Sequence, residues 1–238
     1  MPCGQIVLFD AGGTLLEVRG SVGEVYGAHA REHGLSIDAR ELDAAFAEAF
    51  RGQGPLAFGE LSPSELAARE RAWWFRVVEQ VFRGRLSEAQ LGPFFDALYE
   101  LFRRPDPWRV FPDVRPALER LGSAGYRLGV VSNFDSRLGE VLSGLGIAGY
   151  FEHVVVSSRT GAAKPDAAIF RRALDLFGVA SADAWHVGDT PEEDIAGAQG
   201  AGIRAVLLDR RRRYTDRDAR ERVGSLTELC DLVTGGSV

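Results

Sequence analysis

A chain of 238 residues is long enough for one large domain, or for a core domain with a smaller one beside it. Apolar residues make up 45% and charged residues 26%, which is ordinary for a soluble globular protein. The net charge of −6 gives no reason to expect a nucleic acid or an anionic membrane as partner, and no apolar run approaches the ~20 residues of a membrane span.

The N-terminus and the cysteines indicate the compartment. The opening "MPCGQIVLFD" has no basic region and enters a strand at once, so we expect no signal peptide. Cys3 and Cys230 lie at opposite ends of the chain and make no disulfide framework. We therefore expect a reduced, cytoplasmic protein; nothing in the sequence indicates its oligomeric state.

The chain begins with one strand and continues with a long helical segment. Residues 6–9, "IVLF", form a continuous apolar run, which predicts a strand buried on both faces and ending at Asp10. Ser62 and Glu65 have capping-box spacing around Pro63, and Ser87 repeats this helix-start signal. The predicted helices cover residues 21–34, 38–52, 62–84 and 86–104.

After the Pro-rich stretch at 103–114 the pattern becomes an alternation of strands and helices. Repeated units of this kind predict an α/β fold with a doubly wound parallel sheet, to which the first strand also belongs. We expect residues 1–16 and 109–238 to form a Rossmann-like core domain, and residues 17–108 to form an inserted helical cap. The predicted strands cover residues 126–132, 153–158, 184–189 and 203–209, and the predicted helices 114–125, 137–146, 166–178 and 192–202.

Polar residues stand at the ends of four of the five predicted strands. In open α/β sheets the ligand lies outside the carboxyl ends of the strands, and a helical insert leaving from that edge would cover it. The sequence therefore predicts an active-site cleft with a lid. The residues at these strand ends are Asp10, Ser132 with Asn133, Ser157 with Ser158, and Asp189.

Composition singles out two of the polar residues. Of 28 basic residues 27 are Arg, and Lys164 is the only Lys; Asn133 is the only Asn. An ammonium is a compact point charge that a guanidinium does not replace. The two positions are candidates for chemistry, with chance survival as the alternative.

Asp10 is the candidate nucleophile, since a carboxylate can form a covalent acyl-phosphate. Gly12 and Gly13 let backbone N–H groups turn toward an oxyanion, and the hydroxyls of Thr14 and Ser132 can donate to it. Taken alone, Asp10 could also be an Asp that only makes a turn.

Other carboxylates accompany Asp10 and call for a cation. Asp189 ends a strand, and Asp194 follows in the first turn of the next helix. Carboxylates gathered beside Asp10 repel one another unless a cation such as Mg²⁺ balances them, although Asp194 could instead cap its helix. Lys164 can neutralise the nucleophile and a phosphoryl oxygen together.

These motifs resemble those of the haloacid dehalogenase-like hydrolase superfamily over nearly the whole chain. "DAGGTL", "VVSN", the pair Lys164-Pro165 and "GDTPEED" are similar to its four motifs, and the pattern looks most like the group called domain-containing protein three. The resemblance implies a nucleophilic Asp10, a Mg²⁺ cofactor, a helical cap and a small phosphorylated metabolite as substrate. It implies Mg²⁺ binding by Asp10, Asp189 and the Gly12 carbonyl with Asp194 in support, and phosphoryl binding by Ser132, Asn133 and Lys164.

The opening motif departs from that of phosphatases in the superfamily. They carry an acid–base Asp two residues after the nucleophile, where this chain has Gly12. Such a group is worth ~10²–10⁴ in rate, so turnover of ordinary phosphate esters is expected to be weak. Two alternatives remain: a catalytically decayed binding or regulatory module, and, against the acidic fourth motif, a metal-independent 2-haloacid dehalogenase.

Three further features have simpler interpretations. We expect His186, inside a strand, to be a core histidine whose hydrogen bonds are satisfied. Trp73 and Trp74 are neighbours on a helix, so one should be buried while the other faces the cleft or a partner. We expect residues 210–213, "RRRR", to form a solvated loop.

Overall fold

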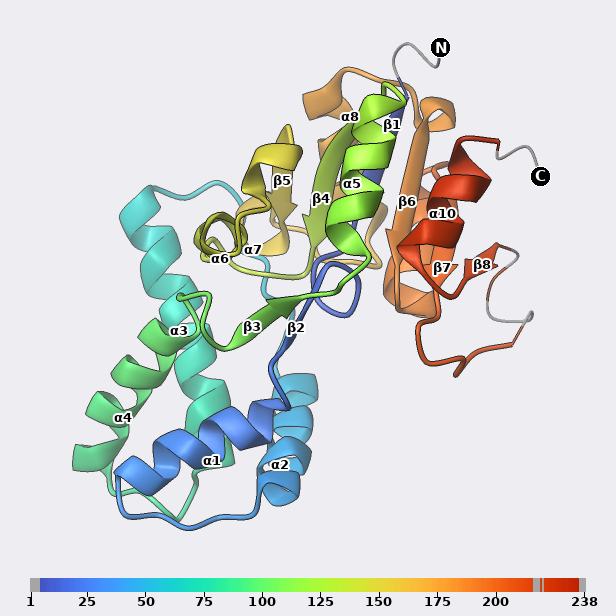
Figure 1. Ribbon diagram of the computed structural model, residues 1–238. Coiled ribbons are helices and arrows are strands. Elements are labelled where there is room, and N and C mark those ends of the chain that lie inside the picture. Colours follow the sequence, from blue (N-terminus) through green and yellow to red (C-terminus); the bar gives the residue numbers. More distant parts are fainter. Residues whose placement is uncertain (1–4, 216–218, 220, 236–238) are drawn as a thin grey trace.

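The computed structural model describes residues 5–215, 219 and 221–235. Within them, a parallel sheet has the strand order β5-β4-β1-β6-β7-β8 (Figure 1). Non-sequential neighbours in this order require crossover connections, as in a doubly wound fold. The strands run Ile6–Phe9 (β1), Arg127–Ser132 (β4), His153–Val156 (β5), Ala184–Gly188 (β6), Arg204–Leu208 (β7) and Arg222–Val223 (β8).

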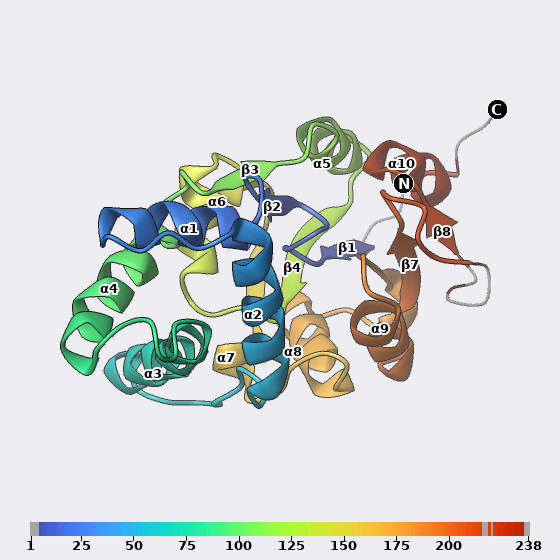
Figure 2. The same cartoon turned by 90° about the horizontal axis from the view of Figure 1, so that it is seen from below.

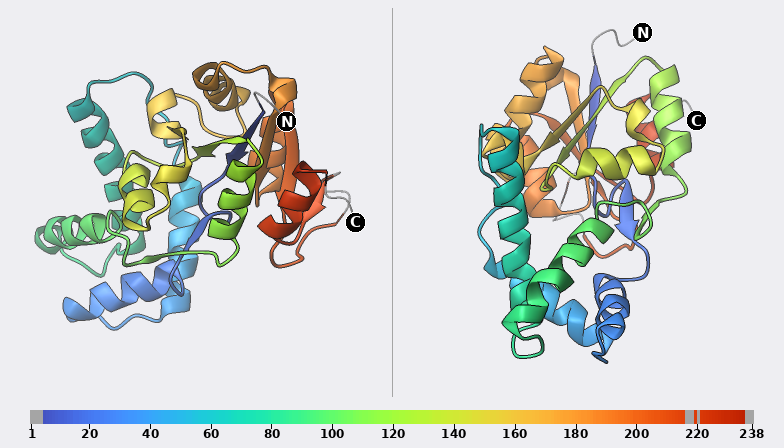
Figure 3. Two further views of the ribbon diagram at one scale, coloured as in Figure 1. Left: turned by 45° about the horizontal axis from the view of Figure 1, so that its top comes forward. Right: turned by 90° about the vertical axis from the view of Figure 1, so that its left-hand side faces the viewer.

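Helices cover both faces of the sheet, which explains why β1 is apolar throughout. Side chains alternate along a strand, so Val7 and Phe9 pack into the cluster on one face while Ile6 and Leu8 pack into the cluster on the other. Both views of Figure 3 show helices on either side of the sheet. The first face carries Val114–Ser123 (α5), Leu138–Gly144 (α6) and Leu226–Val233 (α10), and the second carries Ala167–Phe177 (α8) and Gly197–Gly200 (α9). The predicted α/β fold class is confirmed.

Four helices from the first half of the chain have an apolar cluster of their own. Its fully buried members include Leu42, Val77 and Phe94. The helices lie together away from the sheet in Figure 1, and Figure 2 views the molecule from their side. A short antiparallel ribbon that we did not predict, Leu16–Val18 (β2) with Trp108–Val110 (β3), carries the chain into and out of this part. The division into core and cap remains a proposal. The helices are Val22–Glu32 (α1), Ala39–Gly52 (α2), Pro63–Val81 (α3) and Glu88–Leu101 (α4).

The capping box predicted for α3 is confirmed. The Ser62 hydroxyl accepts a hydrogen bond from the Glu65 N–H, and the Glu65 carboxylate accepts one from the Ser62 N–H at 3.1 Å. These two bonds satisfy amide donors that have no partner within the helix. Helix α3 is therefore well specified at its start, which matters because it carries groups that contact the core.

Two predicted elements are wrong in part. The strand expected over 153–158 ends at Val156, and Ser157–Thr160 form a helical turn (α7). The helix expected over 192–202 begins as a π-helix, Pro191–Ala196 (η3), before α9. Both changes occur at the carboxyl edge of the sheet, where side-chain contacts override local propensity. Short 3₁₀ turns, Ala148–Tyr150 (η1) and Ser181–Asp183 (η2), precede β5 and β6.

Two further features of the described residues concern membrane spans and cysteines. No helix in the described part of the chain is long and apolar enough to cross a membrane. Cys230 is a free, buried thiol. Cys3 and the start of the N-terminal segment, on which the other expectations rest, lie outside the described residues.

Candidate active site

Asp10, directly after β1, lies at the centre of a buried polar cluster. Its Oδ1 accepts hydrogen bonds from the Ser132 hydroxyl at 3.0 Å and from Lys164 Nζ at 2.6 Å. Ser132 ends β4, and Lys164 lies in the loop before α8, so two distant segments, 122 and 154 positions along the chain from Asp10, meet at the carboxyl edge of the sheet. All three side chains are buried. The structure thus brings the predicted nucleophile into contact with two of the predicted phosphoryl-binding residues, Ser132 and Lys164.

Asp10, Asp189 and Asp194 make an acidic cluster with more negative charge than Lys164 offsets. One carboxylate oxygen from each of the three lies within 4.8 Å of the others. Burial, together with the charges of Asp10 and Asp194, raises the pKa of Asp189 to about 7. A carboxyl that retains its proton near neutrality lacks a counter-charge, and oxygen donors are the ligands that Mg²⁺ takes. The donor set therefore fits a divalent cation.

Asp194 is held by three hydrogen bonds from three different parts of the chain. Its Oδ1 accepts from Lys164 Nζ at 2.6 Å and lies 3.1 Å from His186 Nε2, and its Oδ2 accepts the Thr190 N–H at 3.0 Å. Burial opposes ionisation, but Lys164 and His186 outweigh it and hold the pKa of Asp194 below its usual value. Asp194 is therefore a fixed anion that orients Lys164, which suits a supporting role beside a cation.

Among the described residues, Lys164 is the only lysine or arginine buried among these carboxylates. Burial alone would lower its pKa, but the charges of Asp10 and Asp194 raise it above the ordinary value. In the absence of a metal, burial and the charge of Asp194 raise the pKa of Asp10, with Lys164 opposing both. Lys164 thus stays charged and favours the ionised, nucleophilic form of Asp10.

Asn133 holds the Lys164 segment through its main chain. Its Oδ1 accepts the Lys164 N–H at 2.7 Å, and its Nδ2 donates to the Lys164 carbonyl at 2.9 Å and to Glu193 Oε2 at 3.1 Å. The side chains of Asn133 and Glu193 both line the cavity above Asp10. The only Asn and the only Lys of the chain are therefore bound to each other.

The glycines after Asp10 have different surroundings. Gly13 has φ +80°, and a Cβ built there would lie 2.5 Å from Asp189 Oδ2, so only glycine fits. Gly12 lines the cavity, and a Cβ there would meet no atom within 4 Å. Thr14 is fully buried, its hydroxyl has no hydrogen-bond partner in the described chain, and it is not among the residues lining this cavity.

A cavity of about 400 Å³ lies above Asp10, between the sheet edge and the helical part. Asp10, Lys164 and Asp189 line its floor, while Phe50 and Arg51 line the opposite side. A polar floor with excess carboxylate charge, beneath a mixed apolar and polar roof, makes a concave site of the size that binds a small ligand. The other helical-part residues that line it are Gln53, Gly54, Pro55, Leu56 and Trp73.

The profile of the family described as haloacid dehalogenase-like hydrolase matches residues 5–202. This chain belongs to that family of hydrolases. The hydrolase is 37% identical to mouse haloacid dehalogenase-like hydrolase domain-containing protein 3 over 206 residues, which cover 86% of this chain and 81% of the mouse protein. The resemblance inferred from the four motifs is confirmed.

Two further relatives bear the name phosphatase. Phosphoserine phosphatase of Thermus thermophilus is 38% identical to this hydrolase over 165 residues, 66% of each chain. The crystal structure of an HAD phosphatase from Thermococcus onnurineus has a TM-score of 0.68 at 27% identity, covering 98% of this chain and 99% of the other. The hydrolase therefore shares its whole fold with a protein of that name.

Sequence reasoning missed two residues of this site and misjudged others nearby. His186 is fully buried, as expected, and its Nε2 contacts Asp194. It is not a satisfied histidine, because its Nδ1 has no hydrogen-bond partner among the described residues. Glu193 lies in the cavity, where burial raises its pKa. The strand alternation that puts His186 and Gly188 on one face could have indicated the contact of His186 with the following helix.

The Ser pair after β5 and the first residue of the Arg run differ from expectation, whereas Arg211, Arg212 and Arg213 are exposed in a loop, as expected. The Ser157 hydroxyl donates to the Leu56 carbonyl and the Ser158 hydroxyl to Glu70, so both face the helical part rather than the substrate cavity. Arg210 is not solvated but donates to Asp113 and to the Thr14 carbonyl. Farther along the run, Arg213 is half-exposed and lies 3.8 Å from Asp189.

Proposed function

We propose that this hydrolase is a Mg²⁺-dependent phosphatase that transfers a phosphoryl group from a small phosphorylated metabolite to Asp10 and then to water. The observation that carries the proposal is the Asp10 carboxylate, which lines the cavity with one oxygen held by Lys164 and Ser132. Its other oxygen, Oδ2, accepts no hydrogen bond from the described residues. The names of the Thermus and Thermococcus relatives support phosphate chemistry.

The residues divide the reaction into two displacements. An Asp10 carboxylate oxygen forms a bond to phosphorus while the bond from phosphorus to the leaving oxygen breaks, and that oxygen takes up a proton. Water then attacks the phosphorus of the aspartyl phosphate, which releases orthophosphate and restores the Asp10 carboxylate. Lys164 and Ser132 donate to Asp10 and lie where they can offset charge on the phosphoryl oxygens.

The acidic cluster would hold the cation. Asp10, Asp189 and the Gly12 carbonyl would bind Mg²⁺, and Asp194 would support it by holding Lys164. When bound, the ion would supply positive charge that offsets the negative charges of the phosphoryl oxygens and of the Asp10 carboxylate, so that these groups can come together. Asn133 completes the proposed phosphoryl-binding set through the main chain of Lys164. Thr14 is not part of that set, because it is buried outside the residues that line the cavity.

The proton for the leaving group has no side-chain donor at position 12. Glu17, which could have replaced it, pairs with Arg109 at 2.6 Å and is not among the residues lining the cavity. We therefore infer slow hydrolysis of simple esters, and faster hydrolysis where the leaving group is acidic or carries its own proton donor.

The decisive experiment measures orthophosphate release from a panel of small phosphorylated metabolites, with Mg²⁺ and with a chelator. Release that requires both the metal and Asp10, tested with Asp10→Asn, supports the phosphatase. Mg²⁺ binding without release from any compound favours a binding module. Halide release from 2-haloacids in the chelator would identify a dehalogenase instead.

A further inference from the structure

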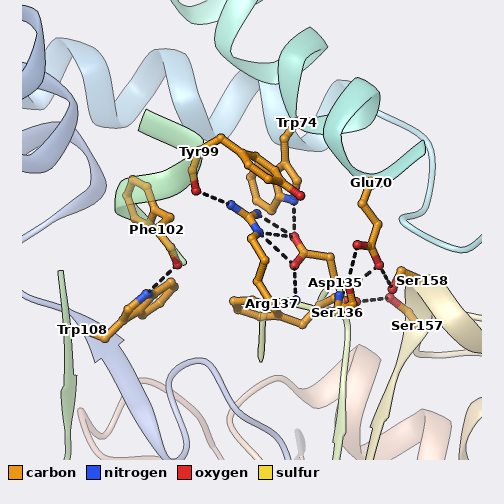
Figure 4. Close-up of polar contacts among 11 residues, drawn as sticks. Glu70, Trp74, Tyr99, Phe102, Trp108, Asp135, Ser136, Arg137, Ser157 and Ser158 are labelled. Carbon is orange, nitrogen blue, oxygen red and sulfur yellow. Dashed lines mark hydrogen bonds and ion pairs between the residues drawn. The ribbon is translucent and has the colours of Figure 1, made fainter. Parts of the chain in front are cut away.

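A buried carboxylate on α3 contacts the core of the hydrolase away from the catalytic cavity. Glu70 is 1% exposed and accepts three hydrogen bonds: from the Ser136 N–H at 2.9 Å, the Ser136 hydroxyl at 2.5 Å and the Ser158 hydroxyl at 2.6 Å (Figure 4). Ser136 lies in the loop after β4, and Ser158 lies in α7. One helical side chain thus joins two segments at the carboxyl edge of the sheet.

A second set of bonds lies one helical turn further along α3. Trp74 Nε1 donates to Asp135 Oδ2 at 2.5 Å, and the Arg137 guanidinium donates to the same oxygen at 2.6 Å. Arg137 also donates to the Tyr99 carbonyl of α4 at 3.0 Å, and its guanidinium lies 3.8 Å from the centre of the Tyr99 ring. Figure 4 shows the Arg137 guanidinium and the Asp135 carboxylate side by side, below the Tyr99 and Trp74 side chains.

The buried carboxylates at this junction have all of these hydrogen-bond donors only when the helical part is docked. Glu70 and Asp135 together carry two negative charges against one on Arg137, and none of the three is more than 5% exposed. Buried charge is costly unless hydrogen bonds compensate it, and here the donors come from both sides of the contact. Separation would leave Glu70 without its three donors and Asp135 without Trp74. The contact therefore specifies one position of α3 on the core.

The loop that receives these contacts begins with active-site residues. Ser132 bonds Asp10 and Asn133 bonds the main chain of Lys164, whereas Asp135 and Ser136 bond α3. Phe134, between the two groups, lines the catalytic cavity. Residues 132–137 thus connect the phosphoryl-binding groups to α3 within six positions.

We propose that Glu70 is a positioning residue, which acts through Ser136 to hold Ser132 and Asn133 in place, so that the phosphoryl-binding groups are aligned only when α3 is docked. The inference rests on the proposed phosphatase function for its kinetic test. Glu70 does not line the cavity and touches no reacting atom.

The kinetic test uses Glu70→Gln, Ser136→Ala and the double variant, with Glu79→Gln as matched control. Glu79 is an exposed carboxylate on the same helix with no hydrogen bond or ion pair among the described residues. An amide at position 70 removes the negative charge and forces the Ser136 hydroxyl to accept a bond where it now donates one. We therefore expect kcat to fall ~10- to ~10²-fold, the scale of misplaced catalytic groups, with Glu79→Gln unchanged. If Glu70 acts through Ser136, the double variant loses no more than the worse single variant.

A purely structural role predicts a different result. It would lower the unfolding midpoint of Glu70→Gln while leaving kcat per folded molecule at the wild-type value, and that outcome overturns the proposal. Equal losses in Glu70→Gln and Glu79→Gln, or additive losses in the double variant, overturn it as well.

Two measurements without turnover keep the inference separate from the proposed function. Amide hydrogen exchange over residues 132–137 should be faster in Glu70→Gln than in wild type, and orthophosphate with Mg²⁺ should bind at least several-fold more weakly by calorimetry. If wild type hydrolyses no phosphate but both shifts occur, the phosphatase proposal fails and the positioning role holds. If neither shift occurs, the positioning role fails whatever the activity.

Discussion

Gly12 and Gly13 follow the nucleophile position but differ in what can replace them. A side chain at Gly13 would collide with Asp189, whereas one at Gly12 would enter open space in the cavity. Gly12→Asp would place a carboxyl beside Asp10, as in the phosphatases that the sequence resembles. We expect turnover of simple phosphate esters to rise, by up to ~10²–10⁴-fold, because a proton donor is restored. The rate of phosphate release in the presence of Mg²⁺ measures this turnover. An unchanged rate in a variant that folds and binds Mg²⁺ would show that another group limits the reaction.

Asp10→Asn tests the nucleophile with almost no change in shape. An amide cannot form the acyl phosphate, so we expect hydrolysis to fall to background. The fold should survive, because Lys164 keeps its bond to Asp194. Phosphate release and the near-ultraviolet circular dichroism spectrum check the two expectations, and wild-type turnover would remove Asp10 from the mechanism.

Asp189 predicts how Mg²⁺ affinity depends on pH. Its pKa is raised to about 7 in the folded, metal-free protein, so a proton must leave before the cation binds. Affinity should therefore rise as the pH increases toward 7 and level off above it. The same shift affects stability without metal. Between about pH 4 and pH 7 only the folded chain keeps this proton, so the contribution of Asp189 to the free energy of unfolding is present below about pH 4 and is lost as the pH rises to 7. Calorimetric titration with Mg²⁺ from pH 5.5 to 8.5 measures the affinity, and an affinity that does not change with pH contradicts the expected dependence.

Among the helices, α3 has a capping box at its start and side chains that bond the loop after β4. Ser62→Ala removes the hydroxyl of the capping box and should lower the free energy of unfolding by about 1 kcal/mol. Ser123→Ala, at the exposed end of α5, is the control and should change it little. Urea unfolding of both variants measures the difference, and equal midpoints would show that the cap contributes nothing measurable.

The elements that we predicted in part wrongly stand where side chains decide the backbone. The apolar run of β5 predicts a strand through Ser158, but the Ser157 hydroxyl bonds the Leu56 carbonyl and the Ser158 hydroxyl bonds Glu70, so the chain turns into α7. Ribbon β2–β3 escaped prediction because each strand has three residues and its partner lies about 90 positions away. Local patterns do not contain such pairings.

For the whole molecule, the separate apolar cluster of α1–α4 supports the proposed cap. Phe94 is fully buried in it, and Phe94→Ala should lower the free energy of unfolding by about 3–5 kcal/mol. If the helical part is a unit of its own, amide exchange should quicken in α1–α4 far more than in β1 and β4. Equal acceleration in both parts would mean that residues 1–238 behave as one domain.

The sequence by itself determined the α/β class, the helical segment inside it and the identity of the catalytic candidates. Apolar periodicity and strand-end polar residues are local signals, and Lys164 and Asn133 stood out against an Arg-rich composition. Only the tertiary structure decided that these two bind each other, that His186 contacts Asp194, and that Glu70 joins α3 to the Ser132–Arg137 loop. Such contacts join residues distant in the chain, and their charges gain a partner only when burial brings them together, so no local pattern reports them.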